Sequence, residues 1–136
     1  MGHVRKIRCG VAGQGLQEIT REVETVVEES NVRDGLCTLF VPHTSASLVI
    51  QENADPSAAR DLERWLCRLV PEDDPLYTHT AEGPDDMPAH VKAALTATSL
   101  SIPILDHRLA LGVWQGIFLW EHRHARADRQ LVIHIH

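Results

Sequence analysis

Histidine is the residue type that first suggests chemistry in this chain. Nine histidines stand against two phenylalanines and one tyrosine, and imidazole both titrates near neutral pH and binds transition metals. His43 follows an apolar run, His79 lies in a loop-like region and His90 lies in a potential helix. No short zinc signature is matched, but three imidazoles from a strand end, a loop and a helix can converge on one ion. His43 alone is equally compatible with a metal ligand, a general base or a strand-end histidine that is hydrogen-bonded to a loop.

Carboxylate and amide side chains are clustered in two other segments that could take part in catalysis or binding. Glu52, Asn53 and Asp55 stand just before a predicted helix, and we expect Asp55 to cap it. The start of that helix also suits an anion such as phosphate. Asp85 and Asp86 are adjacent. One of the pair is expected to cap a third helix and the other to orient a ligand histidine through its second ring nitrogen.

Trp114 and Gln115 form a third candidate, between Gly112 and Gly116. A glycine inside a strand often marks a bulge or a close backbone approach. The indole and the amide therefore offer a flat surface and a polar group to a ligand or to a neighbouring subunit. An ordinary tryptophan of the core is the alternative interpretation.

Hydropathy patterning predicts the elements that must position these residues. Their order, with three strands in succession at the C-terminal end, favours an α+β fold with a mixed, largely antiparallel sheet packed with about three helices. The long region 70–86, rich in proline and acidic residues, is expected to be a functional loop within a single domain, 1–136. The predicted strands are 4–11, 36–41, 47–50, 100–104, 108–123 and 131–135, and the predicted helices are 16–30, one from Asp55-Pro56 and one from Asp86.

Composition excludes several classes of function. The net charge of −6 argues against binding nucleic acid or an anionic membrane through bulk charge. No apolar run reaches the roughly 18 residues of a membrane span, and no apolar stretch of signal-peptide length is present. Three cysteines without a CxxC motif favour reduced thiols. We therefore expect a cytoplasmic protein.

Seven segments together resemble the YjbQ-like family, small bacterial and archaeal proteins to which a secondary thiamine-phosphate synthase activity is ascribed. The resemblance implies an α+β fold that assembles as a homotrimer, with His43, His79 and His90 holding a divalent metal, preferably zinc. Two departures are His107, where the family usually has glycine in a hairpin turn, and Val113, where it usually has threonine. The matching segments are 43–47 (HTSAS), 52–56 (ENADP), 77–79 (YTH), 83–90 (GPDDMPAH), 108–112 (RLALG), 114–116 (WQG) and 121–123 (EHR).

Two hypotheses of function follow from these residues. The first is a metal-dependent enzyme acting on a small phosphorylated molecule, either a thiamine-phosphate synthase-like transferase or a zinc-dependent hydrolase. Glu52 and Asp86 would then serve as general base or as partners of the ligand histidines, and Asn53, Trp114 and Gln115 would bind the small molecule. Three histidines suit zinc better than magnesium, which prefers oxygen ligands. The second hypothesis is a non-catalytic trimeric module that binds a metal or an anion.

Overall fold

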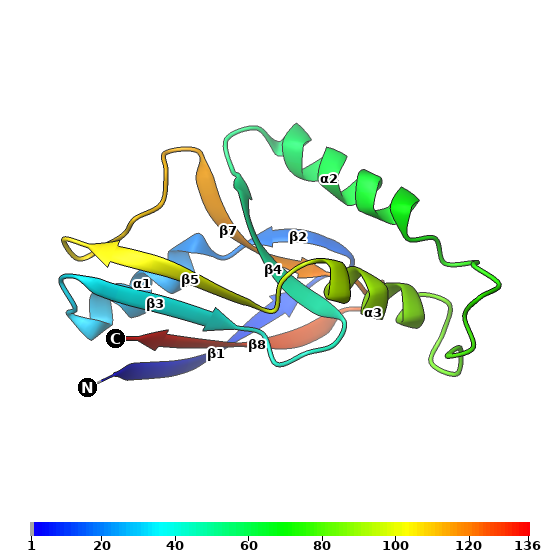
Figure 1. The fold of residues 1–136 in the computed structure, drawn as a ribbon, viewed down its shortest axis with the longest axis horizontal. Coiled ribbons are helices and arrows are strands. Elements are labelled where there is room, and N and C mark those ends of the chain that lie inside the picture. Colours follow the sequence, from blue (N-terminus) through cyan, green and yellow to red (C-terminus); the bar gives the residue numbers. More distant parts are fainter. Residues whose placement is uncertain (1) are drawn as a thin grey trace.

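The structure is a computed structural model that describes residues 2–136, and it confirms an α+β fold (Figure 1). Within these residues three helices accompany two antiparallel sheets rather than the single sheet that the pattern predicts. The elements are β1 (His3–Val11), β2 (Gly15–Glu18), α1 (Thr20–Ser30), β3 (Gly35–Phe40), β4 (Ala46–Glu52), α2 (Pro56–Leu69), α3 (Asp86–Leu95), β5 (Ser99–Leu105), β6 (Arg108–Leu109), β7 (Gln115–Glu121) and β8 (Ala127–Ile135).

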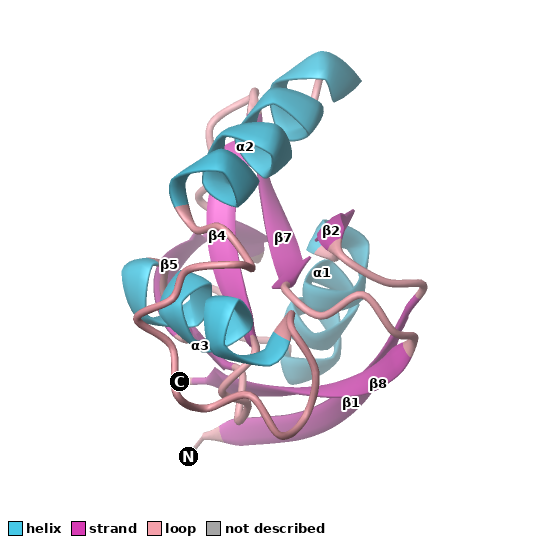
Figure 2. Cartoon of the chain, turned by 90° about the vertical axis from the view of Figure 1, so that its right-hand side faces the viewer, coloured by secondary structure: helices cyan, strands magenta, loops and turns pink. Residues whose placement is uncertain are grey.

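The two sheets enclose the main apolar core together with α1. The larger sheet has the strand order β1-β8-β3-β5-β6 and the smaller one β2-β7-β4. Alternation along β7 sends Ile117 and Leu119 into this core and Trp120 to the opposite face, where it packs with Leu66 of α2. The smaller sheet is thus covered on one face by the core and on the other by α2, as Figure 2 shows from the side.

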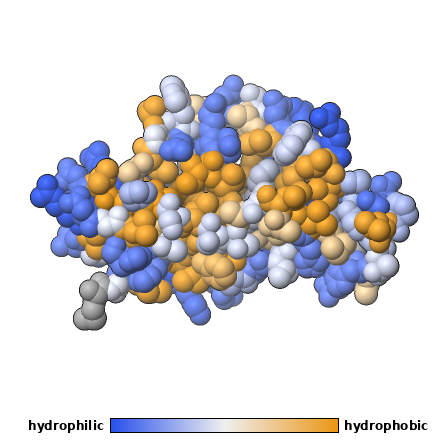
Figure 3. Space-filling model, viewed as in Figure 1, coloured by the Kyte–Doolittle hydropathy of each residue, from blue (hydrophilic) through white to orange (hydrophobic). Residues whose placement is uncertain are grey.

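Apolar side chains also reach the surface. Figure 3 shows them gathering over the face that carries β3, β5 and α3. These three elements hold the exposed Phe40, Leu105 and Leu95. None of the helices within residues 2–136 combines the length and the apolar character needed to cross a membrane.

The predicted helix 16–30 begins later than its periodicity suggests. Its apolar face is confirmed, because Val23, Val26 and Val27 are buried. Residues 15–18, however, form β2, in which Leu16 is paired with Trp120. Leu16 packs beneath α2 instead of extending the α1 face, so its helical spacing from Ile19 was misleading.

The predicted strand 108–123 is divided between the two sheets. Its first residues form β6 and its last form β7, and Trp114 lies in the connection between them rather than in a strand. The turn from β5 to β6 holds Asp106 and His107 at φ of 50° and 68°. His107 therefore adopts the left-handed conformation. This is expected at a position where the YjbQ-like family, which the sequence resembles, usually has glycine.

Asp55 caps α2, as predicted. Its Oδ1 accepts a hydrogen bond from the Ser57 amide at 2.9 Å, and Pro56 is the first helical residue. The same amide lowers the pKa of Asp55, so the cap is at full strength at neutral pH and weakens as the carboxyl group protonates in acid.

Removing this cap should cost a modest amount of stability. Asp55→Ala is expected to lower the Tm by roughly 2–6 °C, the size of effect that follows the loss of one helix cap in a domain of this length. Asp55→Asn, which keeps a side-chain acceptor, is the matched control and should lose less. Differential scanning calorimetry at pH 7 measures both, and equal Tm values for Asp55→Ala and the wild type would contradict the assignment.

Candidate metal centre

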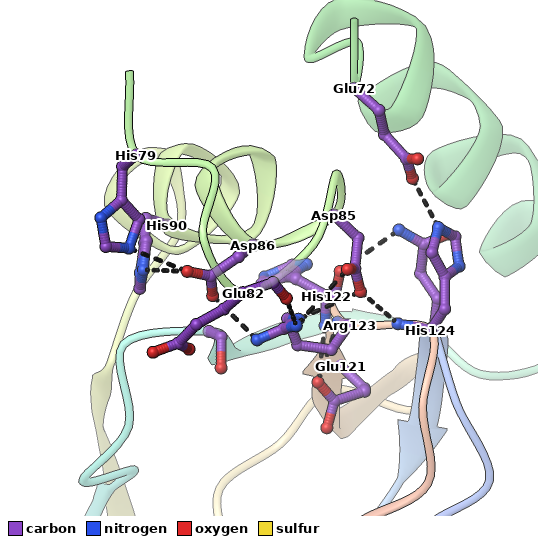
Figure 4. Close-up of polar contacts among 12 residues, drawn as sticks. Glu72, His79, Glu82, Asp85, Asp86, His90, Glu121, His122, Arg123 and His124 are labelled. Atoms are coloured by element: carbon purple, nitrogen blue, oxygen red, sulfur yellow. Dashed lines mark hydrogen bonds and ion pairs between the residues drawn. The ribbon is translucent and has the colours of Figure 1, made fainter. Parts of the chain in front are cut away.

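Three side chains converge where the 70–85 loop meets α3. His79 comes from the loop, while Asp86 and His90 lie four residues apart and so share one helix face. Asp86 Oδ2 lies 2.9 Å from His79 Nε2 and 3.4 Å from His90 Nε2 (Figure 4). One ligand atom from each residue lies within 4.8 Å of the other two. This is the spacing at which three donors can bind one cation.

Asp86 is the centre of this group. Its side chain is only 3% exposed. Oδ1 accepts a hydrogen bond from Arg123 Nη1 at 2.8 Å, whereas Oδ2 is buried and has no hydrogen-bond partner in the described part of the chain. Buried carboxylate oxygens are normally satisfied. An unsatisfied oxygen that faces two imidazole nitrogens therefore fits a site built for a metal ion.

The His90 ring is oriented by the backbone. Its Nδ1 lies 3.0 Å from the Thr44 carbonyl oxygen, to which the ring N–H donates. The hydrogen on Nδ1 leaves the lone pair on Nε2, which is the atom directed at Asp86. Metal-binding histidines are commonly held by such a bond through their other ring nitrogen. The ring centroids of His79 and His90 are 5.4 Å apart.

Arg123 ties the loop to the start of α3. Its guanidinium donates to Asp85 Oδ2 at 3.0 Å, to Asp86 Oδ1 at 2.8 Å and to the Glu82 carbonyl at 2.8 Å. Asp85 Oδ2 also accepts the His124 amide at 2.9 Å. Burial acts to raise the pKa of Asp85, but the hydrogen bonds from Arg123 and His124 prevail and lower it. Asp85 is thus a charged anchor for the loop.

The two adjacent aspartates differ in their surroundings, and the expected side-chain cap is not made among residues 2–136. Helix α3 begins at Asp86 with Asp85 before it, and Asp85 makes no side-chain capping bond within the described residues. Asp86 Oδ2 faces the Nε2 atom of each histidine, a position from which the carboxylate can orient a ring or bind the same ion. The four-residue spacing of Asp86 and His90 was the signal in the sequence that could have predicted their contact.

His43 does not belong to this group within the chain. Its Nε2 accepts a hydrogen bond from the Gln130 amide at 2.8 Å, and burial, followed by the charge of Arg129, lowers its pKa. The predicted convergence of three histidines is therefore corrected: His79 and His90 meet, and the third member is Asp86. The loop after His43 still reaches the site, through the Thr44 carbonyl.

Glu52 also lies away from Asp86. The register of β4 on β7 pairs Ala46 with Glu121 and Glu52 with Gln115. These two pairs are six residues apart, so they are separated by about 20 Å along the strand. Glu121 is on the Arg123 side, which places Glu52 at the far end of the smaller sheet. Within one chain, Glu52 and Asp86 cannot share one site.

The three residues predicted to bind a small molecule lie at that same far end. Asn53 Nδ2 donates to Glu18 Oε2 at 3.1 Å, and Gln115 Oε1 accepts the Gly112 amide at 2.8 Å. Trp114 is 64% exposed, so it is not a core residue. Within one chain, these side chains lie apart from the group around Asp86.

The buried His122 is a polar residue whose importance the sequence pattern did not indicate. It is only 1% exposed. Its Nε2 lies 2.8 Å from Ser47 Oγ. Burial, and then the positive charges of Lys92 and Arg129, lower the pKa of His122 to about 3. The residue is thus neutral in the folded protein at physiological pH.

This shift predicts an acid-sensitive fold. Between about pH 6.5 and pH 3 an unfolded histidine binds a proton that folded His122 does not bind. Its contribution is therefore complete above about pH 6.5 and is lost as pH falls, at up to about 1.4 kcal/mol per pH unit. His122→Gln should flatten the dependence of the unfolding free energy on pH, measured by urea titration from pH 7 to 5. An unchanged slope in His122→Gln would refute the prediction.

Comparison with known proteins places the chain in a family. The model of the UPF0047 protein YjbQ-like family matches residues 6–136. UPF0047 protein sll1880 of Synechocystis sp. is 53% identical over 133 residues, covering 98% of this chain and 90% of the relative. UPF0047 protein YjbQ of Escherichia coli O157:H7 is 38% identical over 133 residues, covering 97% and 96%.

Solved structures agree with this assignment. The crystal structure of an uncharacterized YjbQ/UPF0047 protein from Clostridium acetobutylicum superposes with a TM-score of 0.90 at 35% identity, covering 97% of this chain and 99% of that chain. A YbjQ-like protein of unknown function from Sulfolobus solfataricus gives a TM-score of 0.87 at 25% identity, covering 99% and 98%. The chain therefore belongs to the YjbQ-like UPF0047 family.

Proposed function

We propose that the protein is a metal-dependent enzyme that acts on a small phosphorylated molecule, with His79, Asp86 and His90 as the metal ligands. The observation that carries the proposal is the buried Asp86 Oδ2, which has no hydrogen-bond partner among residues 2–136 and faces the Nε2 atoms of two histidines. Structural histidine–carboxylate contacts usually satisfy the carboxylate oxygen by hydrogen bonding. The three donor atoms here lie within 4.8 Å of one another, with both imidazole nitrogens close to the same carboxylate oxygen.

The donor set favours zinc in a catalytic role. Two imidazoles and one carboxylate form the protein ligands of several catalytic zinc sites, whereas structural zinc sites usually have four protein ligands. The same set also suits iron(II), so the metal must be identified by analysis. Magnesium is disfavoured because it prefers oxygen ligands. This argues for hydrolysis over a synthase-type transfer that releases pyrophosphate.

The exposure of the three ligands suits a reaction with a substrate from solution. The His79 side chain is 54% exposed and that of His90 is 29% exposed, while that of Asp86 is 3% exposed. The histidines therefore form the solvent-facing side of the centre. Arg123 holds the buried carboxylate in place from behind through Oδ1. When bound, zinc supplies a Lewis acid and lowers the pKa of a coordinated water.

Charge supports an anionic substrate. One carboxylate leaves a divalent ion with a net positive charge of about one, in a chain whose net charge is −6. A phosphate group would therefore be drawn to this point of the surface. Arg123 is already engaged by Asp85, Asp86 and the Glu82 carbonyl, so it serves to position Asp86.

Turnover of phosphorylated compounds tests the proposal. Zinc-loaded and iron-loaded wild type are assayed against phosphate monoesters, phosphate diesters and a pyrophosphate ester. Activity should require the metal, and it should fall by about 10²-fold or more in Asp86→Asn. His43→Ala should retain it. Absence of turnover in both metal-loaded forms would instead support a non-catalytic metal-binding module.

Self-association belongs to the same proposal. Phe40, Leu95 and Leu105 of β3, α3 and β5 are exposed, and Val113 and Trp114 are 83% and 64% exposed. Exposed apolar surface of this kind marks interaction sites. Light scattering is expected to give three times the chain mass of 15.2 kDa, and a monomer at micromolar concentration would refute the homotrimer.

A further inference from the structure

A second polar site lies in a cavity between α2, α3 and the outer face of the smaller sheet. Leu66 of α2 and Val91 of α3 pack in one cluster with Trp120 of this face, and Figure 2 shows α2 above α3. The cavity has a volume of about 230 Å³. None of the three candidate metal ligands lines it. Its walls are Gln14, Gly15, Glu63, Arg64, Leu66, Cys67, Lys92, Trp120 and His122.

Lys92 brings an unbalanced charge to this cavity. The residue is only 3% exposed, and its Nζ donates to Cys67 Sγ at 3.4 Å. Across the described chain it makes no ion pair within 4.0 Å. A thiol is a weak acceptor and carries no compensating charge. A buried ammonium group is costly unless a counter-ion is close to it.

His122 brings an unpaired hydrogen-bonding atom to the same cavity. Its Nδ1 is buried and has no partner within residues 2–136. The Ser47 hydroxyl lies 2.8 Å from Nε2 and has no other hydrogen bond among these residues. If Ser47 donates to Nε2, the neutral ring must carry its hydrogen on Nδ1. The unpaired atom is then an N–H donor without an acceptor among residues 2–136.

We propose that this cavity binds a small organic monocarboxylate. Its carboxylate would accept hydrogen bonds from Lys92 Nζ and His122 Nδ1, which removes both defects at once. Its apolar part would pack against Trp120 and Leu66. The volume of about 230 Å³ lies below the roughly 300–1,000 Å³ of drug-sized sites, so the ligand must be small.

Glu63 determines the preference for a monoanion. Its carboxylate lines the same cavity, and Oε2 accepts the Leu16 amide at 2.6 Å. The negative charge of Glu63 and the single ammonium of Lys92 together disfavour a dianion such as a phosphate monoester. Arg64, also in the lining, is paired with Asp61 at 2.6 Å on the exposed surface of α2.

The presence of only two lysines, Lys6 and Lys92, makes a direct test possible. The full-length protein, isotopically labelled on lysine Nζ, is titrated with benzoate, neutral benzamide or dianionic phenyl phosphate. Benzoate should shift the Lys92 signal and leave that of the exposed Lys6 unchanged. Benzamide and phenyl phosphate should each bind at least about tenfold more weakly, because one lacks the charge and the other is opposed by Glu63.

A pair of matched variants separates binding from folding. Lys92→Met should weaken benzoate binding at least about tenfold, while raising the Tm of the free protein because it removes an unpaired buried charge. Lys6→Met should change neither property. The result should be the same in metal-free Asp86→Asn protein, so this test is independent of the proposed metal centre.

Three results would overturn the proposal. The first is an unmoved Lys92 signal at tens of millimolar benzoate. The second is unchanged benzoate affinity in Lys92→Met. The third is tighter binding of phenyl phosphate than of benzoate, which would make the cavity a phosphate site.

Discussion

Asp86→Asn is expected to weaken zinc binding by at least about 100-fold, because it removes the charged oxygen that faces both histidines. Partners that only orient a ligand already contribute about 10–100-fold to metal affinity, so the loss of a direct donor should reach or exceed the top of that range. His90→Ala should have a similar effect. Competition with a chromophoric chelator at pH 7 measures the affinities. For the wild type, affinity should fall in acid, because protons compete for the imidazole nitrogens.

His43→Ala is the control that makes this prediction specific. His43 accepts a hydrogen bond from the Gln130 amide and lies outside the group around Asp86. Its replacement should therefore leave zinc affinity within about threefold of the wild type. Wild-type affinity in Asp86→Asn, or a loss in His43→Ala as large as that in His90→Ala, would contradict the assigned ligands.

Arg129→Met is expected to destabilise the fold by about 3–5 kcal/mol, the effect of breaking a buried ion pair by removing one partner. Arg129 Nε donates to Glu121 Oε1 at 2.6 Å, and both side chains are largely buried. Glu121 Oε2 also accepts the amides of His122 and Arg123 at 3.0 Å each. Without Arg129, the carboxylate would keep its amide donors but lose its counter-charge.

A double variant separates the unpaired charge from lost packing. Glu121→Gln combined with Arg129→Met leaves an oxygen for the two amides and no buried charge, so it should regain part of the stability that Arg129→Met loses. Urea unfolding at pH 7 gives the free energies. A loss below about 1 kcal/mol in Arg129→Met would show that the pair is not an important support of the fold. A double variant no more stable than Arg129→Met would show that packing is the main term.

Local patterns predicted much of the fold. The alternating and helical spacings located α2, α3 and most strands, and Asp55-Pro56 marked the start of α2. Patterns failed where tertiary pairing decided the outcome. Leu16 has helical spacing but pairs with Trp120 in a sheet. The strands β6 and β7 belong to different sheets, although the sequence pattern predicts one continuous strand over both.

The sequence predicted only part of the candidate site, because two residues that are close in sequence can lie far apart at the two ends of a strand. His43 precedes β4 and Glu52 is its last residue, and the seven residues of this strand separate their surroundings by about 20 Å. On a helix the opposite holds, since Asp86 and His90 are brought together by a four-residue spacing. His79 lies in the 70–85 loop, which Arg123 anchors through Asp85 and the Glu82 carbonyl. These contacts join distant parts of the chain and so leave no local signal in the sequence.

Anomalous diffraction at the zinc edge, from crystals of protein loaded with one equivalent of zinc, tests the central claim most directly. The account predicts one strong peak bound by His79 Nε2, Asp86 Oδ2 and His90 Nε2, each at about 2.0–2.2 Å. A peak bound by His43, or no peak beside Asp86, would contradict it.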